Sequence, residues 1–329
     1  MKAEILALLR ERADYVSGQE LCEHFGVSRT AVWKAINQLK KEGYKIEAVT
    51  NKGYLLVPEE GAADVFGQNE LESRMDTKWA GHPVSFYESI NSTNLRAKLD
   101  ADEGAPQGAL VVADMQTAGR GRRGRSWNSP AGTNVYFTLI LKPDFAPDAA
   151  SQLTLVMAMA VADAIKETCG IESAIKWPND IVVDGRKVCG MLTEMSVERD
   201  YIHHIVIGVG INVGLQEFAP EIAATAASLE QFCGRKIPRA ALVANVMKAF
   251  EKYYETFLIT CDMSGLLAAY NQMLVNRGRQ VRVLDPQGEY TGVSQGINAA
   301  GELLVQTEDG SVKNVYAGEV SVRGIYGYT

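Results

Sequence analysis

The sequence predicts a multidomain α+β protein: an N-terminal winged helix-turn-helix, a central mixed α/β sheet domain and a C-terminal SH3-like β-barrel. Residues 1–57 show helical periodicity followed by a short strand-turn-strand pattern. From about residue 65, buried-strand runs alternate with helix-like runs, and from residue 278 short strands are separated by turn signals. We therefore place three domains, at 1–58, 65–276 and 277–329.

Three helices are predicted in the first domain. Apolar side chains between Ile5 and Leu9 indicate the first helix, and the S-x-x-E spacing that starts at Ser17 begins the second. Ser28 is a suitable N-cap for a third helix over 29–41, whose apolar residues recur with helical spacing. The outer face of this third helix is therefore left polar and basic.

A hairpin with a basic tip follows the third helix. Strands expected at 45–49 and 54–57 complete the order of a winged helix-turn-helix DNA-binding domain. Residues 1–57 carry nine Lys and Arg against seven Asp and Glu, a net charge of +2, so the remainder carries −9 of the total of −7. Basic and polar side chains suit phosphates and base edges, and the expected DNA contacts are Ser28, Arg29, Thr30, Lys34, Asn37 and Lys52. A protein-contact module is the alternative, and Trp33 fits either packing or DNA contact.

The central domain is expected to begin after a linker at 58–64. Asp184 and Gly185 form a turn signal between two apolar runs, which predicts a hairpin. Ser92 or Thr93 is expected to cap a helix. Strands are expected at 84–87, 109–113, 134–141, 181–183, 186–193 and 204–209, and helices at 92–99, at 148–169 and, as a pair, between 238 and 274.

The C-terminal domain is expected to contain short strands only. They are predicted at 281–283, 290–294, 303–307, 312–316 and 320–322, with turn signals at 285–288, 298–301 and 308–310. Such spacing is typical of small barrels, and an SH3-like barrel is the natural expectation.

Composition excludes several classes of protein. At 329 residues, with 47% hydrophobic and 22% charged residues, the chain resembles an ordinary globular protein. Its start is too short and too charged for a signal peptide, and apolar runs such as 155–162 are shorter than the roughly 18 residues of a membrane span. Five scattered cysteines without a CxxC pattern indicate reduced thiols. We expect a cytoplasmic protein with no membrane partner.

The run GRGRRGRSW at 119–127 sets four arginines on a glycine-rich loop beside an aromatic ring. Glycines let backbone amides approach a ligand, and arginines neutralise phosphate or carboxylate groups, so the loop is suited to hold an anion. The run also matches the dinucleotide fingerprint G-x-G-x-x-G. That fingerprint requires a helix directly after the glycines, whereas a strand-like run at 134–141 follows here. A solvated arginine-rich loop is the alternative.

Other catalytic patterns fail in context. The sequence GVSQG at 292–296 matches a nucleophile elbow, but no histidine follows His204, so the triad order of that fold cannot be completed. Four histidines, without H-E-x-x-H or a Cys/His ligand spacing, make a zinc site unexpected. His203 and His204 are expected to point to opposite faces of a strand. We therefore predict no protein-bound metal.

A second cluster combines KWPND at 176–180 with RKVCG at 186–190. Together with the arginine loop it supplies cations, a carboxylate and a carboxamide, but no nucleophile paired with a base. This set suits a reaction in which the substrate brings its own nucleophile. One such reaction is the activation of a carboxylic acid by ATP, in which the carboxylate attacks the α-phosphate.

Four motifs in this order resemble the biotin protein ligase family. They are QTA at 116–118 running into GRGRRGRSW, then KWPND, RKVCG, and GVGIN at 208–212. The fused winged helix makes the chain similar to the bifunctional members that also repress the biotin operon. The resemblance spans essentially the whole chain, and it implies a central domain of the class II synthetase and biotin–lipoate ligase type.

The resemblance also implies site residues. Lys187, Arg122 and Asp180 would be catalytic, with Asp180 orienting the two cations, and Trp127 would pack against adenine. The implied biotin-binding residues are Ser92, Thr93, Asn94, Gln116, Gly119, Arg120, Arg122, Lys187 and Gly190. The implied ATP-binding residues are Arg122, Arg125, Trp127, Lys176, Asn179, Lys187, Asn212 and Arg323.

The implied reaction has two steps. Biotin and MgATP give biotinyl-5′-AMP, and biotin is then transferred to a lysine of a biotin carboxyl carrier protein, such as that of acetyl-CoA carboxylase. The same adenylate would act as corepressor for operator DNA, bound by a homodimer when the adenylate is present. A ligand-sensing transcription factor without ligase activity and a lipoate or octanoyl ligase are the alternatives.

Overall fold

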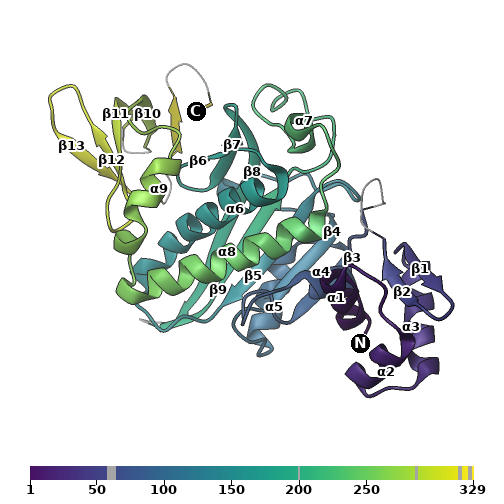
Figure 1. Ribbon diagram of the computed structural model, residues 1–329. Coiled ribbons are helices and arrows are strands. Elements are labelled where there is room, and N and C mark those ends of the chain that lie inside the picture. The colour runs from purple at the N-terminus through teal and green to yellow at the C-terminus, as the bar shows by residue number, and fades with distance from the viewer. Residues whose placement is uncertain (58–63, 199–200, 286–287, 318–320, 325–327) are drawn as a thin grey trace.

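The computed structural model describes residues 1–57, 64–198, 201–285, 288–317, 321–324 and 328–329. Its centre is a seven-stranded sheet with the strand order β3-β4-β5-β9-β8-β7-β6 (Figure 1). Only the β3–β4 pair is parallel among its described ladders. The strands are β3 Val84–Ile90, β4 Leu110–Gln116, β5 Val135–Leu141, β6 Ala174–Lys176, β7 Asp180–Val183, β8 Arg186–Glu198 and β9 Tyr201–Ile211.

Alternation along the strands sorts side chains to the two faces of this sheet. On one face Leu110 and Leu139 join the main core, which α6 (Leu153–Cys169) and α8 (Arg239–Thr260) cover. On the other face Val111, Ile140 and Val206 pack against α5 (Thr93–Asp102), as the separate apolar cluster there shows. The face with α5 is covered less completely, which leaves room for a pocket beside that helix.

Helix α6 is the buried centre of the protein. The segment Pro147–Cys169, which includes the preceding 3-10 turn η2 (Pro147–Gln152), is long and apolar enough to cross a membrane, yet 78% of its apolar window is buried. It packs against α8 and the sheet, and it ends at Gly170 in the left-handed conformation. This apolar helix is therefore accounted for by the core of the central domain.

The first domain has the predicted winged helix-turn-helix elements. They are α1 Lys2–Arg12, α2 Gly18–Phe25, α3 Arg29–Lys41, β1 Ile46–Val49 and β2 Gly53–Leu56. Ser17 and Ser28 accept hydrogen bonds from the backbone amides of Glu20 and Ala31, so both predicted N-caps are confirmed. Gly53 has a φ of 118°, and a Cβ there would lie 2.1 Å from the carbonyl oxygen of Val16. A glycine is therefore required where the wing crosses the chain before α2.

The first domain is joined to the central domain by α4 (Gln68–Arg74), a helix that the sequence did not reveal. Glu70, which is 2% exposed, accepts from Arg10 of α1 at 2.9 and 3.1 Å and pairs with Arg74. Arg10 also donates to Ser73. A buried carboxylate held by two arginines has a defined geometry, so α1 is docked on α4 in a fixed orientation. The linker predicted at 58–64 lies, apart from Asp64, outside the described residues.

The C-terminal strands form one antiparallel sheet with the order β13-β12-β11-β10-β14. The strands are β10 Gln280–Leu284, β11 Tyr290–Ile297, β12 Leu303–Gln306, β13 Val312–Val315 and β14 Ser321–Gly324. Within the described residues no ladder joins β13 to β14, so a closed SH3-like barrel is not confirmed. The sheet packs on the central domain through Gly301, whose carbonyl accepts from the Trp177 indole at 3.1 Å.

Several sequence expectations need correction. The short elements α4, β6 and α7 (Glu230–Cys233) were not predicted. The two helices expected between 238 and 274, in contrast, are confirmed as α8 and α9 (Leu267–Met273). Ser92 stands at the N-cap of α5, but its side chain makes no capping hydrogen bond. A bulge in β9 brings the rings of His203 and His204 together, which contradicts the expectation that they face opposite sides.

Candidate functional site

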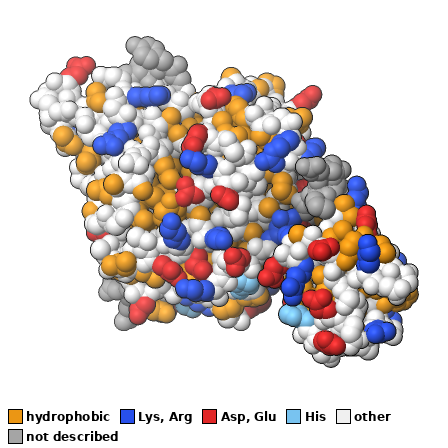
Figure 2. Space-filling view, in the orientation of Figure 1, with side chains coloured by type: hydrophobic (Ala, Val, Ile, Leu, Met, Phe, Trp, Pro, Cys, Tyr) orange, Lys and Arg blue, Asp and Glu red, His pale blue; other side chains and the backbone are white. Residues whose placement is uncertain are grey.

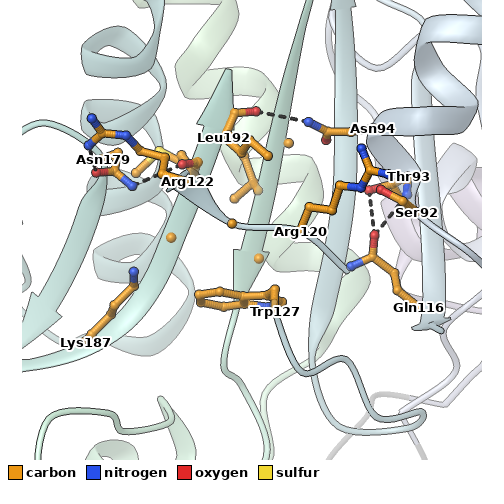
Figure 3. A pocket seen from close by; sticks show the side chains of 16 residues that line it. Ser92, Thr93, Asn94, Gln116, Arg120, Arg122, Trp127, Asn179, Lys187 and Leu192 are labelled. Carbon is orange, nitrogen blue, oxygen red and sulfur yellow. Dashed lines mark hydrogen bonds between the residues drawn. The ribbon is translucent and has the colours of Figure 1, made fainter. Parts of the chain in front are cut away.

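A pocket lies on the α5 face of the central sheet, beside the N-terminus of that helix (Figure 3). Its floor is formed by glycines of β8 and β9, where a side chain would fill the space. A Cβ at Gly208 would lie 2.0 Å from Asn94 Oδ1, and one at Gly210 would lie 2.5 Å from Trp127 Nε1. The lining residues are Ser92, Thr93, Asn94, Gln116, Arg120, Gly121, Arg122, Trp127, Asn179, Lys187, Gly190, Met191, Leu192, Gly208, Val209 and Gly210.

One side of the pocket is a neutral wall of hydrogen-bonded side chains. Gln116, the last residue of β4, accepts from the Thr93 amide at 2.9 Å and from its hydroxyl at 3.1 Å. Its amide group donates to Ser129 Oγ at 3.0 Å. Thr138 Oγ1 of β5 lies 2.8 Å from Thr93 Oγ1, while its proton is donated to Asn94 Oδ1. These bonds hold donors and acceptors in fixed directions at the pocket, which suits a small polar ring.

Asn94 occupies the space above Gly208. Its carbonyl accepts from Thr138 at 2.7 Å, and its amide donates to the Leu192 carbonyl at 3.2 Å and to Glu194 at 2.8 Å. The side chain is 5% exposed. Asn94 is therefore held in place by β5 and β8 together, and it cannot swing away without losing three hydrogen bonds.

The arginine loop crosses the open side of the pocket. It contains the 3-10 turn η1 (Arg122–Gly124), in which Arg123 has a φ of 59°, and the chain then pairs Arg120 with Ser126. Strand β5 follows, so no helix opens after the glycines and the loop is not a dinucleotide-binding turn. Arg120 is exposed, whereas Arg122 turns inward.

Arg122 and Asn179 face each other on the second side of the pocket, as Figure 3 shows. Arg122 donates to Asn179 Oδ1 at 2.7 Å and to the carbonyl of Ala317 at 2.6 Å. Asn179 donates to Asp180 and to the carbonyl of Met191. Burial lowers the pKa of Arg122, and the charge of Asp180 opposes that shift. A fixed, partly desolvated guanidinium is well placed to attract an anion.

A buried charge cluster stands behind this second side. Lys187 Nζ lies 2.6 Å from Asp180 Oδ1, and the Tyr328 hydroxyl donates to the other oxygen of the same carboxylate. Burial alone would raise the pKa of Asp180, but Lys187 and Lys176 outweigh it and hold that pKa below its usual value. Burial lowers the pKa of Lys176 to about 8, and its ammonium lies 3.8 Å from the centre of the Tyr328 ring. Asp180 therefore stays ionised and orients Lys187.

Trp127 lies between the two sides, over the glycine floor (Figure 3). A Cβ at Gly190 would meet the Trp127 ring at 2.9 Å and Lys187 Nζ at 3.0 Å, so both side chains fill the space above this glycine. The Trp127 indole nitrogen is buried and has no hydrogen-bond partner among the described groups. A buried donor without a partner is a destabilising feature that a ligand or a movement of the ring would relieve.

The structure does not bring every predicted residue to the pocket. Gly119 is buried within the loop, Arg125 is exposed, and Lys176 and Asp180 lie behind the lining. Asn212 donates to the carbonyl of Ala227 and so supports the segment before α7. Arg323 of β14 is exposed, and its charge contributes to lowering the pKa of Lys176, so it lies on the side of that lysine.

Sequence reasoning missed several supporting residues. They are Ser129, Thr138, Gly208, Gly210 and Tyr328. The two glycines belong to the GVGIN run. Alternate glycines along a strand could have indicated that other groups approach one face of that strand closely. Nothing in the sequence links Tyr328 to Asp180, because 148 residues separate them and only the tertiary fold joins them.

Most of the predicted DNA-contact residues are exposed on the first domain, and Asn37 is half-buried. Arg29, Thr30 and Lys34 are exposed on α3, and Lys52 is exposed at the tip of the β1–β2 turn. Trp33 is 57% exposed beside them, so it does not pack in the core of the domain. Ser28 uses its side chain to cap α3. Figure 2 shows basic and acidic groups intermingled on the face seen there, in keeping with the small net charge of +2.

Family models match three successive parts of the chain. Residues 2–55 match the "HTH domain", residues 86–212 the "Biotin/lipoate A/B protein ligase family", and residues 278–323 the "Biotin protein ligase C terminal domain".

Relatives match over nearly the whole chain. The "Bifunctional ligase/repressor BirA" of Bacillus subtilis is 39% identical over 94% of each chain. The protein of the same name from Escherichia coli is 31% identical over 97% of this chain and 96% of its own. Among solved structures, the biotin protein ligase from Aquifex aeolicus in complex with biotin and ATP superposes with a TM-score of 0.65 and 30% identity, covering 74% of this chain and 99% of its own.

Proposed function

The chain belongs to the family of bifunctional biotin ligase/repressors, and from that premise we propose that it makes biotinyl-5′-AMP, transfers biotin to a carrier protein and represses transcription. The carrier is a biotin carboxyl carrier protein, such as that of acetyl-CoA carboxylase. The adenylate acts as corepressor at operator DNA. One observation carries the enzymatic part: a neutral polar wall and an anion-binding wall face each other across one glycine floor.

The neutral wall suits the ureido ring of biotin. Thr93, Asn94 and Gln116 present donors and acceptors that are already oriented by their own hydrogen bonds, and Ser92 lines the pocket beside them. Gly119 shapes the turn that leads to Arg120, which closes over the ring. Biotin bound here would extend its carboxylate across Gly190 toward Arg122 and Lys187. Rigid, pre-oriented partners reduce the entropy lost on binding.

The opposite wall suits the triphosphate. A biotin carboxylate oxygen attacks the α-phosphorus, a new P–O bond forms, and the bond to the β-phosphate oxygen breaks to release pyrophosphate. Lys187 and Arg122 stabilise the charge on the α-phosphoryl oxygens, while Asp180 holds Lys187 in place. We assign nucleotide binding to Arg125, Lys176, Asn179, Asn212 and Arg323, and stacking on adenine to Trp127. In the second step the carrier lysine attacks the acyl carbon, forms the amide and releases AMP.

Magnesium ion enters this proposal with the nucleotide. Mg²⁺ prefers oxygen ligands and is commonly held by substrate phosphates with one or two carboxylates. No Asp or Glu is among the described residues that line the pocket, and Asp180 behind it is already bonded to Lys187 and Tyr328. The pocket therefore suits a Mg²⁺ ion held mainly by the phosphates, whose negative charge the ion would neutralise.

We place the protein in the cytoplasm and propose that the adenylate-bound form is a homodimer. Beyond Gly190 the outer edge of β8 has no strand ladder within the described residues. Met195, Val197 and Tyr201 of the β8–β9 hairpin are exposed there. An unpaired edge with apolar neighbours favours pairing with a second copy. The winged helices of the two copies would then bind the two halves of an inverted-repeat operator.

Incubation with biotin, MgATP and an apo carrier domain tests the ligase. We expect the carrier to gain the mass of one biotinyl group, with pyrophosphate released in equal amount. The same preparation should bind operator DNA more tightly with adenylate than without it. If the carrier gains no mass while biotin alone still promotes DNA binding, the chain is a sensor and not a ligase. If lipoate or octanoate is transferred in place of biotin, the substrate assignment is wrong.

Lys52→Ala tests the wing as a DNA contact. Lys52 is exposed at the hairpin tip, with its ammonium 5.5 Å from the centre of the Tyr15 ring. We expect weaker operator binding and a salt slope that is smaller by about one unit, because each phosphate contact releases about one counterion. Fluorescence anisotropy with adenylate at several salt concentrations measures this. Ligase activity should be unchanged, and Lys236→Ala is the matched control. An unchanged salt slope would show that Lys52 does not contact the DNA.

A further inference from the structure

We propose that Asp102, His203 and His204 form a binding site for a divalent transition-metal cation such as Zn²⁺. The three residues come from the end of α5 and the beginning of β9, outside the pocket. Their nearest ligand atoms all lie within 4.8 Å of one another. The proposed biotin and ATP chemistry does not use these residues.

A β-bulge brings the two imidazole rings together. In the β8–β9 ladder Ser196 pairs with His204 and Val197 pairs with Ile202, so His203 is an extra residue without a partner opposite. Neighbouring residues of a regular strand point to opposite faces, but an inserted residue interrupts that alternation. As a result the Nδ1 atoms of His203 and His204 lie 3.3 Å apart.

The carboxylate completes a triangle of ligand atoms. Asp102 Oδ1 lies 3.4 Å from His204 Nδ1 and 3.8 Å from His203 Nδ1. Zinc bonds to imidazole nitrogen and carboxylate oxygen are about 2.0–2.2 Å long, so tetrahedral ligands are separated by about 3.4 Å. The centre of the observed triangle is about 2.0 Å from each corner, a normal metal–ligand distance. The ligand atoms therefore need little movement to hold the cation.

The surroundings suit a cation with one open position. His204 is 3% exposed, whereas His203 and Asp102 are 49% and 59% exposed, so the site is fixed on one side and open to water on the other. Two nitrogens and one oxygen favour zinc, copper or nickel over magnesium and calcium.

Two lysines face the site, and both have other partners. Lys98 lies 2.5 Å from Glu194, which compensates its charge. Lys142 donates to the carbonyl of Ala101 at 3.3 Å, so its ammonium is held at the backbone of α5. Their positive charges reduce the affinity for a cation without closing the site.

A bound cation would fix the far end of the helix that carries two of the proposed biotin-binding residues. Helix α5 begins with Thr93 and Asn94 at the proposed biotin wall and ends at Asp102. The cation would tie that end to β9, next to the exposed β8–β9 hairpin. Metal binding should therefore stabilise the folded chain by mass action and raise its melting temperature.

Zinc titration of the full-length, chelator-treated protein tests the site, with neither nucleotide nor biotin present. By calorimetry we expect one equivalent of Zn²⁺, bound at least 10-fold more tightly than by His203→Gln or Asp102→Asn. Both variants change exposed side chains, and circular dichroism confirms their fold. His24→Gln, which changes an exposed histidine of α2, is the matched control and should bind as the unmodified chain does.

Cobalt separates this site from the cysteines. With Co²⁺ we expect visible d–d bands that disappear in His203→Gln, together with no thiolate charge-transfer band. Equal Zn²⁺ affinity in the unmodified chain and both site variants would overturn the proposal. Thiolate bands that account for all of the bound cobalt would also overturn it, because the metal would then lie on cysteines such as Cys22, Cys233 or Cys261.

Discussion

Replacement of Lys187 by alanine is expected to lower the rate of adenylate formation by about 10³-fold, the upper range for loss of one charge-stabilising donor. Lys187 lines the pocket and is held 2.6 Å from Asp180. It is the one ammonium among the described pocket-lining side chains, so no neighbour replaces it. Single-turnover release of pyrophosphate from biotin and MgATP measures the effect.

The fold should persist in Lys187→Ala. Asp180 would keep its bond to Tyr328 and the nearby charge of Lys176, so the buried carboxylate is not left without partners. Thermal unfolding followed by circular dichroism checks this point. Lys166→Ala is a suitable control, because its ion pair with Glu172 is largely exposed and such pairs contribute little. Near-normal pyrophosphate release from a folded Lys187→Ala protein would refute the catalytic role.

Gly208→Ala is expected to weaken biotin binding by one to two orders of magnitude. The added Cβ would lie 2.0 Å from Asn94 Oδ1, so the amide must move. Asn94 would then lose its bonds to Thr138, Leu192 and Glu194, and buried groups without partners each cost about 1–3 kcal/mol. The wall proposed to hold the ureido ring would be distorted. Calorimetric titration with biotin, in the absence of ATP, measures the change.

Gly67→Ala provides the matched control for this steric effect. Gly67 has an extended backbone conformation, and a Cβ there meets no atom within 4 Å. Its biotin affinity should therefore equal that of the unmodified chain. If Gly208→Ala folds and binds biotin normally, Asn94 does not border the biotin site, and the assignment of the neutral wall is wrong.

The sequence predicted most helices and strands because their signals are local. The caps at Ser17 and Ser28 and the left-handed end of α6 at Gly170 depend on residues a few positions apart. Short elements such as α4 and β6 were missed, since seven or three residues carry too little periodicity. The barrel prediction relied on strand spacing alone, which cannot decide whether the two edge strands meet.

The candidate site likewise depends partly on local sequence and partly on the tertiary structure. The sequence by itself determined which residue types are available, in the GRGRRGRSW, KWPND, RKVCG and GVGIN runs, and these were sufficient to indicate the family. Only the tertiary structure decided which of them share a pocket: Asn179, Lys187 and Trp127 line it, whereas Asn212 supports the segment before α7. The bond from Tyr328 to Asp180 and the bulge at His203 likewise exist only in the folded chain. The physical reason is that composition and local spacing set chemistry and secondary structure, while burial, strand register and contacts between distant residues are properties of the packed chain.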